Sequence, residues 1–383
     1  MALGVSLLAI FLAAAPSPST KAPASFEQIA KEADTARAAD RLHDAIQLYR
    51  EGLHFNPSWR DGWWSLATLY YDEDRFSEAE EAFKHFVALD PLKGAADAFL
   101  GLCEYELGEY EPALQHFRRW ASARWPGTPE LRDVAVFHFA LLLTRDGEFV
   151  HALYLLAPEA AKVGENPALV EAMGLASLRM RNVPEDYPPE KREMVWLAGE
   201  AAAYQAQQPH DISRAEEYGY RLVSRYPRQP EVHYFRGTLF TFENKSAEAE
   251  REYRQELEIS TQHVPAMIAL ANLDLDDNEL READRLARKT VELAPKDPEA
   301  HHVLGRILMA NGQNEASAKE LETAKQLAPD SPLVRSHLAM IYSRLGRTQA
   351  AKVEAAAFLH LKNQEGVLAP PEEKLKSAAK EPR

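Results

Sequence analysis

The chain has 383 residues, of which 46% are hydrophobic and 27% are charged, the composition of a folded globular protein. Its 44 Lys and Arg residues are outnumbered by 59 Asp and Glu residues, so the net charge of −15 disfavours binding to nucleic-acid phosphates. The single cysteine, Cys103, excludes an internal disulfide framework and a cysteine-rich zinc site. No apolar run reaches the roughly 18 residues of a membrane-spanning helix.

The amino end has the pattern of an export signal. Residues 2–15 are apolar except for Ser6, and small residues and prolines follow them, although no Lys or Arg precedes the apolar run. The small-x-small pattern at residues 22–24 predicts cleavage before Ser25, with cleavage after Ala15 as the alternative. An uncleaved helix of about 14 residues would be about 21 Å long, short of a bilayer core of roughly 30 Å. We therefore predict a signal peptide over residues 1–24 and a periplasmic or secreted mature protein.

A repeat with a period of about 34 residues runs through the rest of the chain. Units aligned by their sequence start at residues 26, 60, 94, 133, 167, 196, 230, 264, 298 and 332, and seven of the nine steps between them are identical in length. The eighth position of every unit is Gly or Ala, and the twentieth is Ala in eight units, Ser in one and Asp186 in another. Such small residues indicate places where two helices approach closely.

The fifteenth position of the repeat predicts a tight turn. It is Gly, Asn or Asp in eight units, with Arg181 and His210 as the exceptions, and these three residue types tolerate the left-handed backbone that ends a helix. Large apolar residues lie between these positions at helical spacings of three and four. Each unit is therefore predicted to be a helix, a tight turn and a second helix.

This pattern resembles the tetratricopeptide repeat family over residues 26–361. The second unit carries the signature almost completely, in Trp63, Leu66, Ala67, Tyr70, Ala79, Phe83 and Pro91. The resemblance implies an all-α fold, a right-handed superhelical solenoid of antiparallel helix pairs with a concave inner groove. It implies little about function, because one fold supports many functions.

The register of the repeat breaks in two places. The step from 94 to 133 is longer than the common one by five residues near 121–128, where we predict a longer connecting loop. The step from 167 to 196 is shorter by five, and three prolines in the segment 182–189 prevent a helix there, so the fifth unit is predicted to lack its second helix and a new helix to begin near Glu190. We predict an N-terminal array over 26–181, a proline-rich irregular loop over 182–189 and a C-terminal array over 190–361. The loop is either a hinge or a rigid kink.

The segment 362–383 is predicted to be a disordered tail, because it has three prolines, many charges and few apolar residues. The last repeat before it ends in Phe358, Leu359 and Leu361. A tail, a cap or a partner must cover this apolar end, and self-assembly of the array is a further alternative.

No motif for catalysis, a metal or a cofactor is present. The sequence has no metalloprotease motif, no nucleophile elbow and no dinucleotide-binding fingerprint. His301 and His302 are adjacent, so on a helix they point about 100° apart. We expect His302 to face the groove and His301 to point inward. No enzyme activity, cofactor or metal is therefore predicted.

In the tetratricopeptide repeat family the first helix of each unit lines the concave face, so the resemblance implies which residues form a groove. Exposed Trp, Tyr and Arg are enriched in binding hot spots, and the unit that starts at residue 230 places Tyr234, Thr238 and Phe242 at three of its groove-facing positions. The predicted groove residues are Trp64, Thr68, Tyr71, Tyr105, Tyr204, Tyr234, Asn272, His302, Arg306 and Arg344.

These observations predict a non-catalytic, exported scaffold that binds partner proteins or peptides in the groove and binds no nucleic acid. The alternative is an enzyme or enzyme-complex subunit that acts on envelope polysaccharide or peptide with a site on the superhelix surface. A pocket where titratable side chains converge would favour the enzyme, whereas an open aromatic and polar groove would favour the scaffold.

Overall fold

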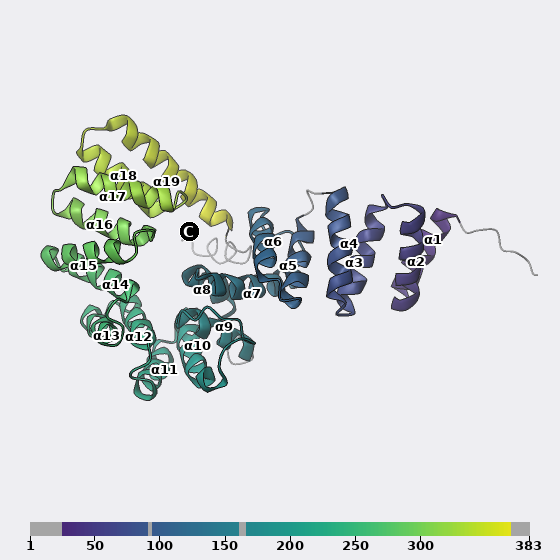
Figure 1. Cartoon of the computed structure of the whole chain (residues 1–383), viewed down its shortest axis with the longest axis horizontal. Coiled ribbons are helices and arrows are strands. Elements are labelled where there is room, and N and C mark those ends of the chain that lie inside the picture. The colour runs from purple at the N-terminus through teal and green to yellow at the C-terminus, as the bar shows by residue number, and fades with distance from the viewer. Residues whose placement is uncertain (1–24, 91–93, 161–165, 369–383) are drawn as a thin grey trace, which may run out of the picture. The chain divides into compact units, whose positions relative to one another are not determined.

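The structure is a computed structural model, and it describes residues 25–90, 94–160 and 166–368. These residues form nineteen α-helices and no strand (Figure 1). They divide into two compact units, the first ending at Leu92 and the second beginning at Lys93. The predicted signal peptide and the end of the predicted tail, residues 369–383, lie outside the described residues.

The first unit consists of two helix pairs. They are α1 (Phe26–Ala38) with α2 (Leu42–Phe55), and α3 (Arg60–Asp72) with α4 (Phe76–Leu89). The chain enters α1 through Ser25, whose hydroxyl accepts a hydrogen bond from the Gln28 amide at 3.3 Å. Arg37 joins the two pairs, because its guanidinium donates to Ser65 at 2.9 Å and to Thr68 at 3.2 Å.

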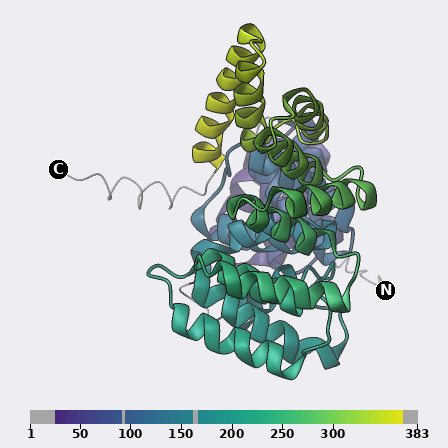
Figure 2. The same ribbon diagram turned by 90° about the vertical axis from the view of Figure 1, so that its left-hand side faces the viewer.

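The second unit continues the same pattern. Its helices are α5 (Ala95–Glu106), α6 (Tyr110–Ser122), α7 (Pro129–Asp146), α8 (Phe149–Leu156), α9 (Pro167–Ser177), α10 (Arg192–Ala206), α11 (Ile212–Arg225), α12 (Val232–Phe242), α13 (Ser246–Ile259), α14 (Val264–Asp276), α15 (Leu280–Leu293), α16 (Pro298–Ala310), α17 (Asn314–Leu327), α18 (Pro332–Arg344) and α19 (Thr348–Leu368). Each helix packs mainly against its neighbours in the sequence, and Figures 1 and 2 both show α19 beside α18. The prediction of an all-α solenoid of helix pairs is confirmed.

The turn column of the sequence is confirmed residue by residue. Asp40, Asp74, Gly108, Gly147, Asn244, Asn278, Gly312 and Gly346 all have positive φ, and they are the eight Gly, Asn and Asp residues of the fifteenth position. The two exceptions, Arg181 and His210, do not. In these eight units the left-handed residue follows the first helix and lets the second run antiparallel to it.

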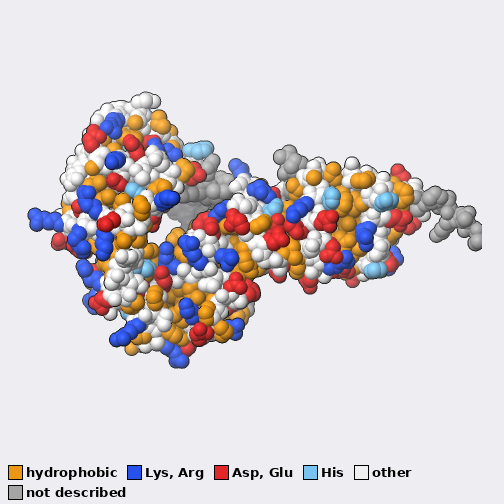
Figure 3. Space-filling view, viewed as in Figure 1, with side chains coloured by type: hydrophobic (Ala, Val, Ile, Leu, Met, Phe, Trp, Pro, Cys, Tyr) orange, Lys and Arg blue, Asp and Glu red, His pale blue; other side chains and the backbone are white. Residues whose placement is uncertain are grey.

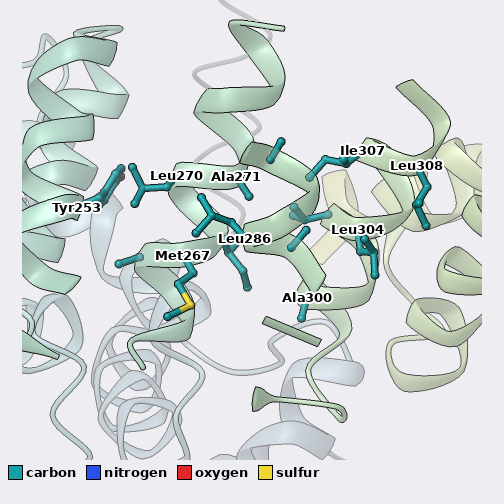
Figure 4. Packing of buried hydrophobic residues seen from close by; sticks show 14 of the residues in the cluster. Tyr253, Met267, Leu270, Ala271, Leu286, Ala300, Leu304, Ile307 and Leu308 are labelled. Atoms are coloured by element: carbon teal, nitrogen blue, oxygen red, sulfur yellow. The ribbon is translucent and has the colours of Figure 1, made fainter. Parts of the chain in front are cut away.

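The small-residue column marks the closest approach of the two helices in a pair. A Cβ added to Gly237 would lie 2.4 Å from the Tyr253 ring, and one added to Gly305 would lie 2.6 Å from the Leu321 side chain. Behind these contacts, buried apolar side chains of α13 to α16 form a continuous core, of which Tyr253, Leu286 and Leu304 are labelled in Figure 4. The core therefore runs along the solenoid from one pair to the next.

The fifth unit lacks a second helix, as predicted. After α9 the chain is irregular through residue 188, and a short 3₁₀ turn (Pro189–Lys191, η2) leads into α10. The loop is anchored, because Val183 is fully buried and the Tyr187 hydroxyl donates a hydrogen bond to Glu171 on α9.

Helices α9 and α10 pack directly on each other across this loop. A Cβ at Gly174 would lie 2.0 Å from the Val195 carbonyl oxygen, and a Cβ at Gly199 would lie 1.9 Å from the Val170 carbonyl oxygen. Only glycine permits this backbone approach. This reciprocal glycine contact joins the helices on either side of the loop, and the compact units divide at 92–93. The division into two arrays at 182–189 stays a prediction.

The loop between α6 and α7 and the carboxyl end of α19 were also predicted from the sequence. Residues 123–128 form the longer connection between α6 and α7, and Trp125 in this loop is buried, edge-on to Trp120 at 4.8 Å. The predicted disordered tail from residue 362 needs correction, because α19 continues to Leu368. Lys362 and Asn363 extend the helix because neither residue is a helix breaker.

Candidate functional site

The predicted groove residues of the first unit are largely engaged in packing. Trp64 is half-buried, with its ring 5.0 Å from Phe86, and Tyr71 is half-buried beside Phe76 at 5.8 Å. Thr68 is only 8% exposed and accepts the hydrogen bond from Arg37. Thr68 is therefore buried, which differs from the expectation that it would be open to a ligand.

Two tyrosines of the second unit also contact neighbouring rings. Tyr105 is buried, with its ring 5.4 Å from Tyr110 and 4.7 Å from His138, and burial raises the pKa of its hydroxyl. Tyr105 therefore belongs to the core rather than to an open groove. Tyr204 is half-buried, stacks on Tyr218 at 5.7 Å and accepts a hydrogen bond from Arg214.

Four predicted residues come together on α14, α16 and α18. Arg306 donates to the side-chain oxygen of Asn272 at 2.6 Å, and Arg344 donates to the Met309 carbonyl at 3.0 Å. Asn272 and Arg306 are one repeat apart, so this bond shows that equal columns of successive units lie side by side. His302 is buried, although we expected it to face the groove, because its Nε2 lies 3.1 Å from His337 Nδ1.

The histidine pair sits in a charged setting. Burial lowers the pKa of His337, and the positive charges of His302 and Arg306 lower it further. Burial raises the pKa of Glu299, but its hydrogen bond to His302 and the nearby positive charges outweigh burial, so that the pKa lies below its usual range. His301 is also buried, and its ring nitrogens contact Glu320 at 2.7 Å and the Pro295 carbonyl at 3.1 Å.

A separate pocket of about 460 Å³ lies among α8, α9, α10 and α12. We call it the α8–α12 pocket. Its volume is within the usual range of ligand sites, about 300–1,000 Å³. It is lined by Phe149, Val150, Leu153, Tyr154, Ala157, Met173, Ala176, Ser177, Arg179, Ala202, Gln205, Ala206, Gln208, His210, Tyr234, Phe235, Thr238 and Phe242. Tyr234, Thr238 and Phe242 were predicted to line the groove, and here they share one wall.

Large apolar side chains stand open at this pocket. Val150 is 80% exposed, Phe242 is 50% exposed and Tyr154 is 47% exposed. Tyr234 is more enclosed, with its ring 4.9 Å from His263 and 5.8 Å from Tyr253, and burial raises the pKa of its hydroxyl. Exposed apolar side chains that gather around one concavity are typical of a binding site.

Arg179 is held over the aromatic wall of the pocket. It follows the end of α9 with φ of 50°, and its guanidinium carbon lies 4.6 Å from the centre of the Phe149 ring and 5.8 Å from that of Tyr234. Such cation–π contacts fix a planar cation against apolar surface. Its nearest carboxylate contact is Glu231 at 3.7 Å, longer than a direct hydrogen bond.

Two polar atoms at the pocket are buried without a hydrogen-bond partner among the described residues. They are the hydroxyl of Ser177 at the end of α9 and the side-chain nitrogen of Gln205 near the end of α10. By contrast, the Thr238 hydroxyl in the same pocket donates to the Phe235 carbonyl at 2.6 Å. Buried polar groups normally have partners, so the unpartnered pair needs an explanation.

The contribution of α8 was missed from the sequence. The predicted groove used only the first helix of each unit, whereas Phe149, Val150 and Tyr154 belong to the second helix of the fourth unit. A signal was available, because the segment FVHALYLL contains no Asp, Glu, Lys or Arg, unlike the second helices around it. A helix that is apolar on all sides must be buried or bind something.

Metal-binding clusters and membrane-spanning helices are absent from the part of the chain that the structure describes. No group of three or more His, Cys, Asp or Glu side chains there could hold a metal ion. No helix there is both long and apolar enough to cross a membrane. On the face seen in Figure 3, Lys and Arg are interspersed with Asp and Glu.

The fold defines a class, an α-solenoid built from helix–turn–helix units that recur along the chain. Residues 31–91, 65–129 and 268–332 match the family model of the tetratricopeptide repeat. The chain contains tetratricopeptide repeats over these residues, and this fold in general serves as a scaffold for protein interactions.

Several solved structures are similar to this chain. MamA 41-end from Desulfovibrio magneticus RS-1 is 17% identical with a TM-score of 0.39, and the match covers 45% of this chain and 96% of that chain. Another crystal structure of MamA is 14% identical with a TM-score of 0.37, covering 42% and 93%. Yeast Tom70 is 12% identical with a TM-score of 0.32, covering 92% and 99%. A search of curated proteins found no matching relative.

Proposed function

We propose that this protein is an exported, non-catalytic scaffold that binds partner proteins or peptides, and that the α8–α12 pocket is a principal contact point. The observation that carries the proposal is the convergence of Val150, Tyr154 and Phe242 on one concavity of about 460 Å³. Covering these side chains would remove apolar surface from water, worth about 25 cal/mol per Å² before the costs of association.

The composition of the pocket supports recognition rather than acid–base chemistry. Most of its lining residues are apolar, and its titratable groups are Arg179, His210, Tyr154 and Tyr234. No Asp, Glu, Lys or Cys side chain lines the pocket, so it offers no carboxylate to act as a general acid or base. The net charge of −15 also supports protein partners rather than nucleic acid.

Export rests on the sequence of residues 1–24 and is part of the proposal. The predicted cleavage before Ser25 would leave intact the serine that caps α1. Expression of the full chain in a bacterial host, followed by cell fractionation and intact mass measurement, tests this point. We expect a periplasmic product that begins at Ser25, and a cytoplasmic product that retains residues 1–24 would contradict it.

Site-specific photo-crosslinking tests partner binding at the pocket. The photoreactive amino acid p-benzoylphenylalanine is placed at position 242 in one variant and at position 55 in another, because Phe55 is equally exposed at 55% but belongs to α2. We expect a defined adduct with an envelope protein from position 242, lost when Val150→Ser is added. Equal adducts from both positions, or none from position 242, would contradict the proposal.

A further inference from the structure

The charges around the α8–α12 pocket differ from those of the whole chain. Asp and Glu outnumber Lys and Arg by 59 to 44 overall, yet the eighteen lining residues include Arg179 and His210 and no Asp or Glu. An apolar pocket without carboxylates in an acidic protein has a local preference for negative or neutral ligands.

The two buried polar atoms of the pocket that lack a partner can both donate hydrogen bonds. The Gln205 side-chain nitrogen is a donor, and the Ser177 hydroxyl, on a residue only 5% exposed, can donate as well as accept. A buried donor left unsatisfied costs about 1–3 kcal/mol. A ligand that brings an acceptor to these two atoms would recover that free energy.

Arg179 adds a cationic donor to the lining of the same pocket. Its side chain is 29% exposed, and its pair with Glu231 at 3.7 Å leaves N–H groups able to donate elsewhere. Because the guanidinium already lies against the rings of Phe149 and Tyr234, less side-chain freedom remains to be lost when a carboxylate binds. Hydrogen bonds to a charged acceptor are roughly twice as strong as neutral ones.

We propose that the α8–α12 pocket binds a peptide segment of a partner protein in which a bulky apolar side chain stands beside a carboxylate. The apolar side chain contacts Val150 and Phe242, and the carboxylate accepts hydrogen bonds from Ser177, Gln205 and Arg179. This inference rests on the proposed function and names the chemistry of the partner. A lysine-flanked apolar segment would meet Arg179 as a like charge and is disfavoured.

Binding of synthetic peptides tests the proposal on the full-length mature chain. The probe is a fluorescein-labelled heptapeptide, Gly-Ser-Asp-Phe-Asp-Ser-Gly, followed by fluorescence anisotropy. Its comparison peptides replace the Asp-Phe-Asp core by Asn-Phe-Asn, Lys-Phe-Lys or Asp-Ala-Asp. We expect the Asp-Phe-Asp peptide to bind about tenfold more tightly than the Asn-Phe-Asn peptide, and the other two to bind more weakly still.

Variants of the protein locate the carboxylate. Ser177→Ala and Gln205→Met each remove an uncommitted donor, so each should weaken binding of the Asp-Phe-Asp peptide several-fold and leave Asn-Phe-Asn binding little changed. Thr238→Val is the matched control, because it removes a hydroxyl from the same pocket that is already bonded to the Phe235 carbonyl. It should leave the preference for Asp-Phe-Asp unchanged.

Each other outcome overturns the proposal in a distinct way. Equal binding of the Asp-Phe-Asp and Asn-Phe-Asn peptides, or preference for Lys-Phe-Lys, would show that the pocket does not recognise a carboxylate. Equal binding of Asp-Phe-Asp and Asp-Ala-Asp would show that the pocket does not recognise a bulky apolar side chain. Binding of decanoate without binding of any peptide replaces the peptide by a small amphiphile, and no binding of any probe also overturns it. The photo-crosslinking experiment at position 242 tests partner binding without any of these peptides, so the proposed function can hold even where the peptide proposal fails.

Discussion

The region of α8 to α12 and the region of α14 to α19 are built from the same kind of helix pair, but their polar side chains are paired differently. From α14 to α18, groove-face polar side chains bond to the neighbouring unit, as Arg306 does to Asn272 and Arg344 does to the Met309 carbonyl. Around α9, the repeat loses a helix, and Ser177 and Gln205 are left without such partners beside exposed apolar side chains. The difference indicates that groove-face polar side chains of the regular units bond across to the neighbouring unit, whereas the interrupted repeat leaves two polar groups available to a ligand.

We call the region of α8 to α12, where the fifth unit lacks its second helix, the interrupted region. The largest expected effect comes from the glycine contact between α9 and α10 within it. Gly199→Ala would force a Cβ to within 1.9 Å of the Val170 carbonyl oxygen, which α9 cannot relieve without moving. We expect a loss of roughly 3–5 kcal/mol in the free energy of unfolding, together with loss of pocket binding. Differential scanning calorimetry measures the first effect.

A matched glycine provides the control. At Gly219 on α11, an added Cβ would meet only the end of the Leu239 side chain, at 3.0 Å. Gly219→Ala should be nearly neutral, because the better helix propensity of alanine offsets the small adjustment. If both substitutions had the same effect, the close junction of α9 and α10 would not be what stabilises this region.

Next in size is the effect on binding of removing an aromatic side chain from the pocket. Phe242→Ala should weaken capture of the partner about 30- to 100-fold, which corresponds to about 2–3 kcal/mol, while the melting temperature changes little because Phe242 is half exposed. Arg344→Ala, which changes an exposed residue of the regular region, should change the dissociation constant less than threefold. Titration calorimetry of the two variants distinguishes the regions, and an equal loss in both would contradict the contrast.

The regular region has a pH-dependent weakness at Asp274. One of its carboxylate oxygens is buried without a hydrogen-bond partner among the described residues, and burial raises its pKa from 3.8 to about 6. As the pH rises from about 4 to about 6, the unfolded chain loses this proton before the folded chain does, so stability falls over that window. Asp274→Asn should therefore stabilise the protein by about 1–2 kcal/mol above pH 6.

The advantage of Asp274→Asn should vanish below about pH 4, where the wild-type carboxyl is protonated in both states. Urea denaturation at pH 4 and pH 7.5 measures the difference. Asp284→Asn is a suitable control, because Asp284 is ion-paired with Arg288 at 2.8 Å. An equal gain at both pH values would show that the charge of Asp274 is not the cause.

The smallest expected effect is at the bond between successive repeats. Arg306→Met removes the hydrogen bond to Asn272 and keeps most of the apolar stem, so the loss of stability should be about 0.5–1.5 kcal/mol. Urea denaturation measures this loss, and Arg306→Lys should lose less stability than Arg306→Met. A loss above about 3 kcal/mol would mean that these polar contacts, rather than the core, hold successive units together.

Much of the fold could be predicted because the determining interactions are local. The left-handed turn residues, such as Asp40 and Gly312, and the close contact at Gly305 depend on residue types at fixed positions of one unit. The loss of a helix after α9 followed from prolines alone. The direct packing of α9 on α10 could not be predicted, because it depends on what fills the space that the missing helix leaves.

The candidate site was predicted only in part, for the same reason. Tyr234, Thr238 and Phe242 were found from their columns, and they line the α8–α12 pocket. The burial of Thr68, Tyr105 and His302 was missed, because a column gives the direction of a side chain on its helix but not the neighbour that covers it. The unpartnered state of Ser177 and Gln205 is a tertiary property with no signal in the repeat.

Hydrogen exchange with and without a saturating partner tests most directly whether the interrupted region is the binding site. Exchange is measured by mass spectrometry on the full-length mature chain. The ligand is the partner protein that is identified by photo-crosslinking from position 242. We predict slower exchange in α8, α9 and α12 and little change in α16 and α18. Slower exchange confined to α14–α19, with α8 and α12 unaffected, would contradict the account.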